Sequence, residues 1–308
     1  MIPFYRSEIR GEYADVIERC LYNVIPAAIS FEGDRFLYVN PLEIWPPVLE
    51  SDPDFASVKP VRQQWYQTAC CPPNLARFLP AIGGYLYTVG DQELLLIHLY
   101  MTNHAILAWH NMPIELDMAG DYPWEDQIDI TLHLPSPVQG TIALRIPSWS
   151  SRTCLSVNGQ NVSADVRNGY AYLCRYWQPS DTITIVFDMT PRIMAAHPRL
   201  MADAGKVAVM RGPVLYCAEE VDSGPFLFQL RLLPEKGFES VPMIIKGRKM
   251  LALRAHGTQM QSDAPPNEAL YRPYTYEEMP RDLLLIPYYA WGNRANHQPQ
   301  EMRVWLMV

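Results

Sequence analysis

The stretch "QIDITLHLP", residues 127–135, alternates apolar and polar side chains from Ile128 to Leu134. Because successive side chains of a β-strand point to opposite faces, this alternation predicts a half-buried strand. Similar patterns occur in "TIALRIP" at 141–147 and "TITIVFDM" at 182–189, and the Asn-Gly pair in "LSVNGQNV" is typical of a hairpin turn. Short strands separated by frequent turn signals predict a β-sandwich.

A second group of strand-like segments runs from "KVAVMRGPVLYCAEE" at 206–220 to "EMRVWLMV" at the end of the chain. Residues 256–282, within this group, are expected to form a long loop. We predict a first sandwich from residues 89–191 together with about 296–308, and a second sandwich from residues 192–295.

The first 88 residues have a different pattern. Apolar residues recur at three- and four-residue steps over 12–25 and again over 73–87, which predicts two helices. Between the helices we expect a hairpin at 31–43 and a proline-rich loop at 44–62.

Prolines mark the second predicted helix. Pro72 and Pro73 suit its first turn, and Pro80 is expected to kink it. Two helices cannot close a core of their own, so we interpret residues 1–88 as part of a larger helical domain. The predicted fold class is therefore mostly β with an N-terminal α segment.

Composition excludes several classes of function. The net charge of −8 and the absence of basic runs argue against a nucleic-acid partner. No apolar stretch is long enough to span a bilayer, so no membrane partner is expected. The N-terminus resembles no signal peptide. We therefore predict a cytoplasmic protein whose cysteines are reduced. Four of the six cysteines are interpreted as small buried hydrophobic residues: Cys20, Cys154, Cys174 and Cys217.

The remaining cysteines, Cys70 and Cys71, stand side by side in "QQWYQTACCPPNLARFL", residues 63–79. They could be packing residues at a helix start, or a strained vicinal disulfide. They could instead be a metal-thiolate site, because two thiolates can bind one zinc and a helix N-terminus lowers thiol pKa values. The seven scattered histidines are interpreted as surface or core residues, and no dinucleotide, phosphate-loop or serine-nucleophile fingerprint occurs.

An ordered set of motifs adds a resemblance to a known family. The set comprises "YADVIERCLYN" (13–23), "RFLYVNPLE" (35–43), "ACCPPNLARFLPAIGGYLYT" (69–88), "DYPWEDQIDITL" (121–132), "LRIPSW" (144–149), "VAVMRGPVLYCAEE" (207–220) and "IPYYAWGNR…EMRVWL" (286–306). Together these motifs resemble glycoside hydrolase family 127, the non-reducing-end β-L-arabinofuranosidases, over nearly the whole chain.

The resemblance implies a fold and a chemistry. It implies an (α/α)6 barrel followed by two β-sandwich domains, with a zinc-bound cysteine as the nucleophile of a retaining hydrolase. Carried onto this sequence, the nucleophile is Cys70, a further zinc (Zn) ligand is Cys71, and Tyr38 lies against the sugar. The implied substrate is an oligosaccharide that contains L-arabinofuranose.

The chain departs from the family pattern at its N-terminal side. The family's Glu-Thr-Cys-Ala motif, which supplies two further zinc ligands, has no match here, and neither does the acid/base glutamate. We therefore expect a truncated protein, with weak or no activity alone, that needs an upstream chain or self-associates through its exposed helical face. The nearby glutamates are expected to be surface or loop carboxylates: Glu8, Glu12, Glu18, Glu32 and Glu43.

Two other functions remain open from the sequence. One is a non-catalytic carbohydrate-binding or structural β-sandwich protein, with sugar stacking on Trp124, Trp149, Trp177 or Trp291 if these are exposed rather than core residues. The other is a thiol redox or metal-sensing protein built on the Cys70–Cys71 pair.

Overall fold

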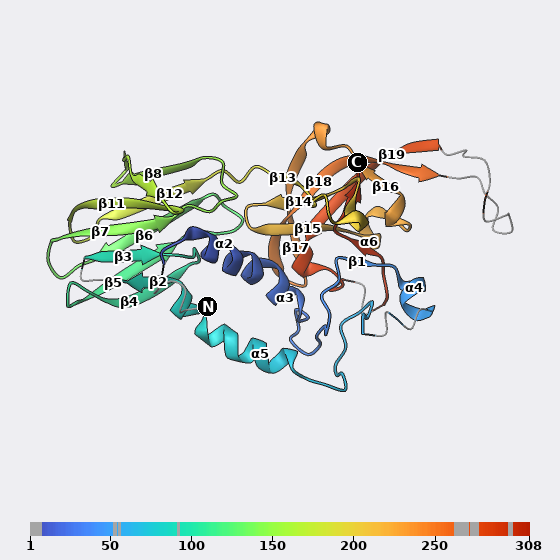
Figure 1. Cartoon of the computed structure of the whole chain (residues 1–308), viewed down its shortest axis with the longest axis horizontal. Coiled ribbons are helices and arrows are strands. Elements are labelled where there is room, and N and C mark those ends of the chain that lie inside the picture. Colours follow the sequence, from blue (N-terminus) through green and yellow to red (C-terminus); the bar gives the residue numbers. More distant parts are fainter. Residues whose placement is uncertain are drawn as a thin grey trace. The chain divides into compact units, whose positions relative to one another are not determined.

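The computed structural model describes residues 8–51, 54, 57–90, 93–261, 271, 277–294 and 298–308 (Figure 1). The chain divides into two compact units. The first unit consists of Met1–Leu21 and Pro73–Thr190, and the second of Tyr22–Pro72 and Pro191–Val308. Both units are built mainly from strands, so the predicted class, mostly β with a short N-terminal helical part, is confirmed.

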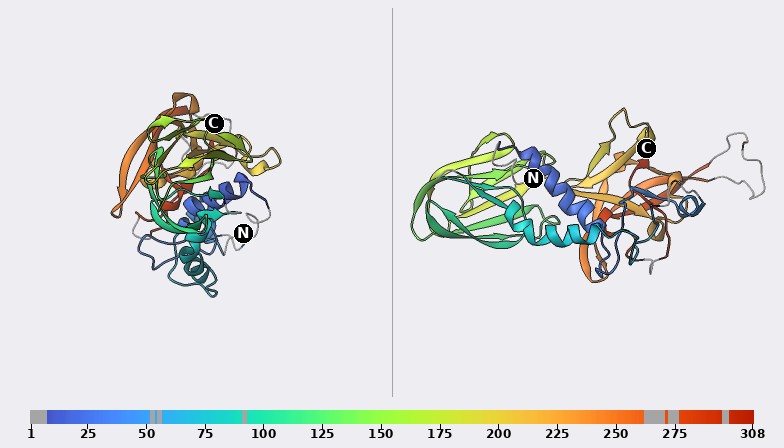
Figure 2. Two further views of the ribbon diagram at one scale, coloured as in Figure 1. Left: turned by 90° about the vertical axis from the view of Figure 1, so that its left-hand side faces the viewer. Right: turned by 60° about the horizontal axis from the view of Figure 1, so that its bottom comes forward.

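The first unit contains two sheets, seen from two further directions in Figure 2. A five-stranded sheet has the order β10-β11-β7-β3-β2, and a six-stranded sheet the order β4-β5-β6-β12-β8-β9. Their strands are β2 (Tyr87–Val89), β3 (Leu94–Ile97), β4 (Asn103–Trp109), β5 (Met112–Ala119), β6 (Gln127–His133), β7 (Val138–Arg145), β8 (Thr153–Val157), β9 (Gln160–Asn161), β10 (Asp165–Arg167), β11 (Tyr170–Trp177) and β12 (Thr182–Phe187).

The strands predicted from alternation are present with their apolar residues buried. In β6, Ile128, Ile130 and Leu132 are buried, whereas the residues between them are more exposed. The hairpin at Asn158-Gly159 joins β8 to β9, and both of its central residues have the positive φ angles that an Asn-Gly turn requires.

The two sheets of the first unit meet in a shared core. Trp109 of β4 is wholly buried and lies against Gly140 of β7, where an added Cβ would be 2.5 Å from the indole ring. Only glycine leaves room for this tryptophan, so one large side chain of the six-stranded sheet fills a gap in the five-stranded sheet.

Helix α2 (Gly11–Arg19) packs on the five-stranded sheet of the same unit. Its Ala14 and Ile17 form a buried cluster with Leu86 and Leu99. At its start, Gly11 donates a backbone hydrogen bond of 2.7 Å to Asn168. The chain then continues through a π-helical segment (Cys20–Val24) and α3 (Ile25–Ala27), so the helix predicted over 12–25 is confirmed.

The second predicted helix is also present. Helix α5 (Cys71–Phe78) starts at the second cysteine and changes to a 3-10 helix at Leu79–Tyr85. The change occurs next to Pro80, where proline removes a backbone donor, as expected.

The second unit contains one ten-stranded sheet. Its main order is β1-β20-β15-β19-β18-β16-β21-β14-β13, with β17 paired to β18 and β14 also paired to β15, so the sheet closes on itself. Its strands are β1 (Glu43–Ile44), β13 (Arg192–Ala195), β14 (Lys206–Arg211), β15 (Val214–Glu219), β16 (Leu230–Leu232), β17 (Phe238–Ile245), β18 (Arg248–Gln261), β19 (Glu277–Pro287), β20 (Met302–Arg303) and β21 (Leu306–Met307).

Short helical segments connect these strands. They are α4 (Pro46–Ser51), α6 (Glu220–Ser223) and the 3-10 turns Met201–Asp203, Leu227–Gln229, Pro234–Lys236 and Tyr288–Ala290.

Several sequence-based boundaries are corrected here. The C-terminal segment, which we grouped with residues 89–191, pairs instead within the second unit, because β20 lies beside β15 and β21 beside β14. Residues 31–43 form a turn with isolated bridges rather than a regular hairpin, and the predicted loop at 44–62 contains α4. The predicted loop at 256–282 is corrected at both of its ends, where 256–261 of β18 pair with 277–282 of β19; of the residues between them, the structure describes only residue 271.

Candidate active site

The two adjacent cysteines lie at the start of helix α5. Their Sγ atoms are 3.8 Å apart, and the side chain of Cys70 is exposed. Pro72 follows within the first helical turn, where its missing N–H is tolerated. No disulfide links the six cysteines, all of which lie within the described residues.

The pKa of Cys71 is raised, whereas a thiol at a helix start is expected to have a lowered pKa. Burial raises the pKa of Cys71 above its ordinary value, and a hydrogen bond and the charge of Cys70 raise it further. Its own backbone hydrogen bond lowers this pKa but is outweighed. A helix N-terminus alone therefore does not activate Cys71; a cation would have to counter the repulsion between two neighbouring thiolates.

An aromatic cluster precedes the thiols in the same unit. The ring of Tyr66 lies 5.0 Å from that of Phe36 and 5.9 Å from that of Tyr38. Burial raises the pKa of Tyr66, and the charge of Cys71 raises it further, which brings Tyr66 and the thiol pair into one electrostatic environment. Tyr38 is 45% exposed, so it has an open surface for a ligand.

Hydrogen bonds fix the segment that leads to the thiols, residues 62–71, at its N-terminal end. Phe36 and Gln63 exchange hydrogen bonds of 2.8 and 2.9 Å. The buried guanidinium of Arg62 donates to the carbonyl oxygens of Ala27 and Trp291 at 2.6–3.1 Å. Burial lowers the pKa of Arg62 to about 10, which still leaves it a cation at neutral pH. The backbone of the segment between Arg62 and Cys71 is therefore held in place at its N-terminal end.

Arg62 and Tyr66 belong to this candidate site, but neither was predicted from the sequence. A signal was present in "QQWYQTACC", where an aromatic pair precedes the cysteines, but only the fold shows that Tyr66 packs on Phe36 and Tyr38.

The carboxylates considered from the sequence have ion-pair partners of their own. Glu8 and Glu12 pair with Arg10, Glu32 with Lys246, and Glu43 with Arg303. Among the described residues, no three His, Cys, Asp or Glu side chains already form a group that could hold a metal.

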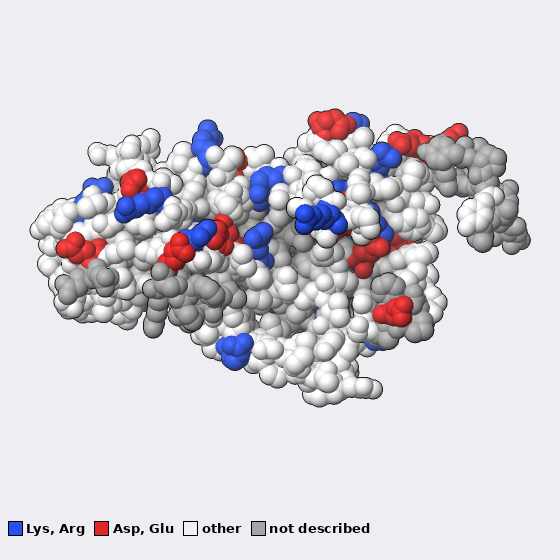
Figure 3. Space-filling view, in the orientation of Figure 1, with Lys and Arg blue, Asp and Glu red and all other residues white. Residues whose placement is uncertain are grey.

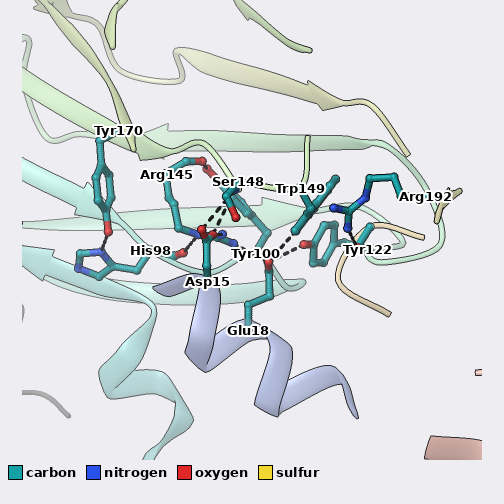
Figure 4. A network of polar contacts seen from close by, with 11 residues as sticks. Asp15, Glu18, His98, Tyr100, Tyr122, Arg145, Ser148, Trp149, Tyr170 and Arg192 are labelled. Carbon is teal, nitrogen blue, oxygen red and sulfur yellow. Dashed lines mark hydrogen bonds and ion pairs between the residues drawn. The ribbon is translucent and has the colours of Figure 1, made fainter. Parts of the chain in front are cut away.

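Glu18 was predicted to be a surface or loop carboxylate, and this prediction is wrong. It is wholly buried in the first unit, where Arg145 reaches both Glu18 and Asp15 (Figure 4). Glu18 also accepts hydrogen bonds from Tyr122 and Trp149, at 2.5 and 2.9 Å. Burial works to lower the pKa of Arg145, but the charges of Glu18 and Asp15 outweigh it and raise the pKa.

This network has a structural role. Both oxygens of Glu18 are occupied by donors, and Asp15 also accepts hydrogen bonds from the backbone N–H of Ser148 at 3.3–3.4 Å. The network joins α2 to the loop after β7 and to β7 itself. This network could not be predicted from the sequence, because Glu18 lies within a helical pattern that also carries exposed polar residues.

Other predictions about single residues are settled by burial. Cys217 is buried as expected, but Cys154 and Cys174 are exposed and Cys20 is only partly buried, so those three interpretations are corrected. Their strands turn these positions away from the core. Trp149, Trp177 and Trp291 are core residues and Trp124 is partly buried, so none of the three buried indoles can offer a sugar-stacking surface.

No helix of the described residues has the length and apolar character needed to cross a membrane.

Comparisons with known proteins show the family of the chain. Three family models match successive parts of the chain: the GH127 β-L-arabinofuranosidase catalytic domain at residues 4–84, the GH127 middle domain at 94–189, and the family 127 C-terminal domain at 191–307. The chain is 34% identical to a non-reducing end β-L-arabinofuranosidase of Bifidobacterium longum subsp. longum over 96% of its own length.

Solved structures give the same result. A GH127 β-L-arabinofuranosidase from Geobacillus stearothermophilus T6 superposes with a TM-score of 0.92 at 37% identity, over 99% of this chain and 47% of that one. A second GH127 β-arabinofuranosidase superposes with a TM-score of 0.84 at 30% identity, over 100% of this chain and 47% of that one.

These relatives are glycosidases, and the mostly-β fold of the chain superposes on their solved structures. The chain belongs to glycoside hydrolase family 127. It spans about half the length of the relatives it matches, 45% of the Bifidobacterium enzyme and 47% of the Geobacillus structure.

Proposed function

We propose that this chain supplies the nucleophile and part of the zinc site of a retaining glycoside hydrolase that acts on β-L-arabinofuranosides. The observation that carries the proposal is the 3.8 Å between the Sγ atoms of Cys70 and Cys71. Two sulfurs bound to one tetrahedral zinc through bonds of about 2.3 Å lie about 3.8 Å apart. The pair therefore already has the spacing of two ligands of one metal ion.

Zinc, when bound, would keep both sulfurs deprotonated and so remove the charge repulsion that raises the pKa of Cys71. The Cys70 thiolate would attack the anomeric carbon, forming a carbon–sulfur bond as the carbon–oxygen bond to the leaving group breaks. A general acid would protonate the leaving oxygen. Water would then attack the same carbon, and the sulfur would leave as thiolate, so two inversions give net retention.

The chain's own residues would also position the sugar. Tyr38 presents an open ring beside Tyr66, and the Arg62 anchor holds the segment that carries both thiols. None of the five candidate glutamates is proposed as the general acid, because each is engaged by a cationic partner.

The remaining ligands and the general acid are proposed to come from a further polypeptide segment that completes the catalytic domain. Helix α5 and the 3-10 turn after it contain no buried residue, and Leu79 is 53% exposed. Figure 3 shows few charged side chains over α5. An exposed helical surface with few charges beside incomplete ligands is the feature expected of a partly covered catalytic domain.

Zinc content and complementation test this function together. The chain is mixed, under reducing conditions, with the portion of the Bifidobacterium enzyme that it does not match. We expect one zinc per complex and release of arabinose from an aryl β-L-arabinofuranoside. Cys70→Ser should abolish hydrolysis, and Cys71→Ser should remove zinc. Cys154→Ser and Cys174→Ser are matched controls, because these exposed cysteines should leave both properties unchanged.

Two results would count against the proposal. A zinc-loaded complex with intact thiols that releases no arabinose would overturn the enzymatic role. Activity of the chain alone would support the catalytic role but overturn the need for a further segment.

A further inference from the structure

Trp65 stands apart from the other tryptophans of the chain. All eight lie within the described residues, and Trp65 alone is exposed, at 70% of its surface. The others are buried or partly buried. Trp65 therefore offers an open indole face that the folded chain does not use for packing.

Its neighbours hold this residue in place. Arg62 is buried and hydrogen-bonded to two backbone carbonyls, and Gln63 is bridged to Phe36. Directly after Trp65, the ring of Tyr66 packs against Phe36 and Tyr38. Trp65 is thus an exposed aromatic residue on a backbone fixed on both sides, and little conformational freedom is lost when a ligand covers it.

Trp65 also lies close to the proposed reaction along the chain. Trp65 lies five positions before Cys70, so the two Cα atoms are at most about 18 Å apart even if the backbone is fully extended. That distance is within the span of a short oligosaccharide. A bound saccharide could therefore contact the nucleophile at one end and the indole ring at the other.

We propose that Trp65 is a stacking platform for the sugar beyond the arabinose that Cys70 attacks, and so sets preference for oligosaccharides over simple glycosides. The inference rests on the proposed function, which it deepens by naming the part of the substrate that is recognised. Indole rings suit this role because a flat apolar face can cover the C–H face of a sugar ring while the polar hydroxyls stay in water.

The test compares two ligands by isothermal titration calorimetry. The chain, with Cys70→Ser in every variant to prevent turnover, is titrated with methyl β-L-arabinofuranoside and with a β-L-arabinofuranosyl disaccharide. The same titrations are made after addition of the complementing portion of the Bifidobacterium enzyme. Trp65→Ala should weaken disaccharide binding about tenfold, which corresponds to about 1.4 kcal/mol, and methyl glycoside binding less than about twofold.

Two further variants control for trivial effects. Trp65→Phe, which keeps an aromatic face, should recover most of the disaccharide affinity. Tyr176→Ala removes another exposed aromatic side chain, on β11 of the first unit, and should change neither affinity. Melting temperatures of all variants show whether each one is folded.

The outcomes separate the two proposals. Equal loss of affinity for both ligands, or no loss for either, would overturn the role of Trp65 and leave the proposed function standing. Weaker association with the complementing polypeptide, at unchanged saccharide affinity, would make Trp65 a protein contact and overturn the inference. Failure of the parent chain to bind either ligand, alone or complemented, would overturn the proposed function and the inference with it.

Discussion

Arg145 in the first unit and the Cys70–Cys71 pair in the second unit are in opposite physical situations. Arg145 is wholly buried, and its charge is met by Asp15 and Glu18 within the same unit. Cys70 is exposed, and the thiol beside it has its pKa raised by burial and by the neighbouring sulfur.

The difference separates a structural polar network from the thiol pair that we propose to be functional. A buried charge is costly unless nearby groups compensate it, so a complete network such as that of Arg145 holds the fold together. Thiols placed at the surface, close enough to repel each other as thiolates, gain from a ligand that arrives later. A carboxylate considered as a catalytic group should therefore be judged by whether its oxygens are already occupied, as those of Glu18 are.

The largest expected effect comes from breaking the buried network. Arg145→Met should lower the free energy of unfolding by about 3–5 kcal/mol, because it leaves two buried carboxylates without their cation. Arg167→Met is the matched control; its side chain is 64% exposed, and its loss should cost less than about 1 kcal/mol. Urea unfolding followed by tryptophan fluorescence measures both. A smaller effect for Arg145 than for Arg167 would refute the structural role of the network.

Thiol labelling tests how far the exposed thiols differ in reactivity from a buried one. Burial raises the pKa of Cys217 well above its ordinary value, whereas Cys70, Cys154 and Cys174 are exposed. Iodoacetamide at pH 8 should modify the exposed thiols more than about tenfold faster than Cys217, as peptide mass spectrometry would show.

Zinc should then protect the pair selectively. In the complemented protein, added zinc should slow labelling of Cys70 and Cys71 but leave Cys154 and Cys174 unchanged. Equal protection of all four thiols would mean non-specific metal binding rather than a site at the pair.

The smallest expected effect concerns an exposed charged cluster on the first unit. Asp117 on β5 lies 2.7 Å from His104 and 2.7 Å from His133, on the two neighbouring strands. The hydrogen bond that His104 donates to Asp117 raises the pKa of His104, and the hydrogen bonds that Asp117 accepts from His104 and His133 lower the pKa of Asp117.

These directions fix the pH dependence. The stabilisation from His104 is present below its ordinary pKa of about 6.5 and is lost as pH rises through its raised value. That from Asp117 is present above its ordinary pKa of about 4 and is lost as pH falls through its lowered value. Asp117→Asn should therefore lower the melting temperature slightly near pH 5.5 and less near pH 9. A larger effect at pH 9 would contradict this assignment.

Local patterns predicted much of the fold. Alternation gave β6, β7 and β12, and the Asn158-Gly159 pair gave the β8–β9 hairpin. Three- and four-residue apolar steps gave α2 and α5. These predictions succeeded because each depends on neighbours within a few residues, where backbone geometry alone sets which side chains share a face. The thiol pair at the start of α5 was visible for the same reason.

Long-range pairing could not be predicted in this way. The C-terminal strands β20 and β21 pair with β15 and β14, whose partner residues lie 83 to 101 positions earlier in the chain. The alternation within β20 and β21 does not indicate which strand each one pairs with. The exposed positions of Cys154 and Cys174 likewise depend on which face of each strand is covered.

The sequence by itself determined the strand-rich class, the two helices and the adjacent thiols of this family 127 chain, because these follow from local periodicity and residue chemistry. Only the tertiary structure decided that Glu18 is buried, that Tyr66 packs beside Tyr38, and that Trp65 alone among the tryptophans is exposed. Each of these three features depends on which segments pack together. That packing depends on the fold of the whole chain and not on residues adjacent in the sequence.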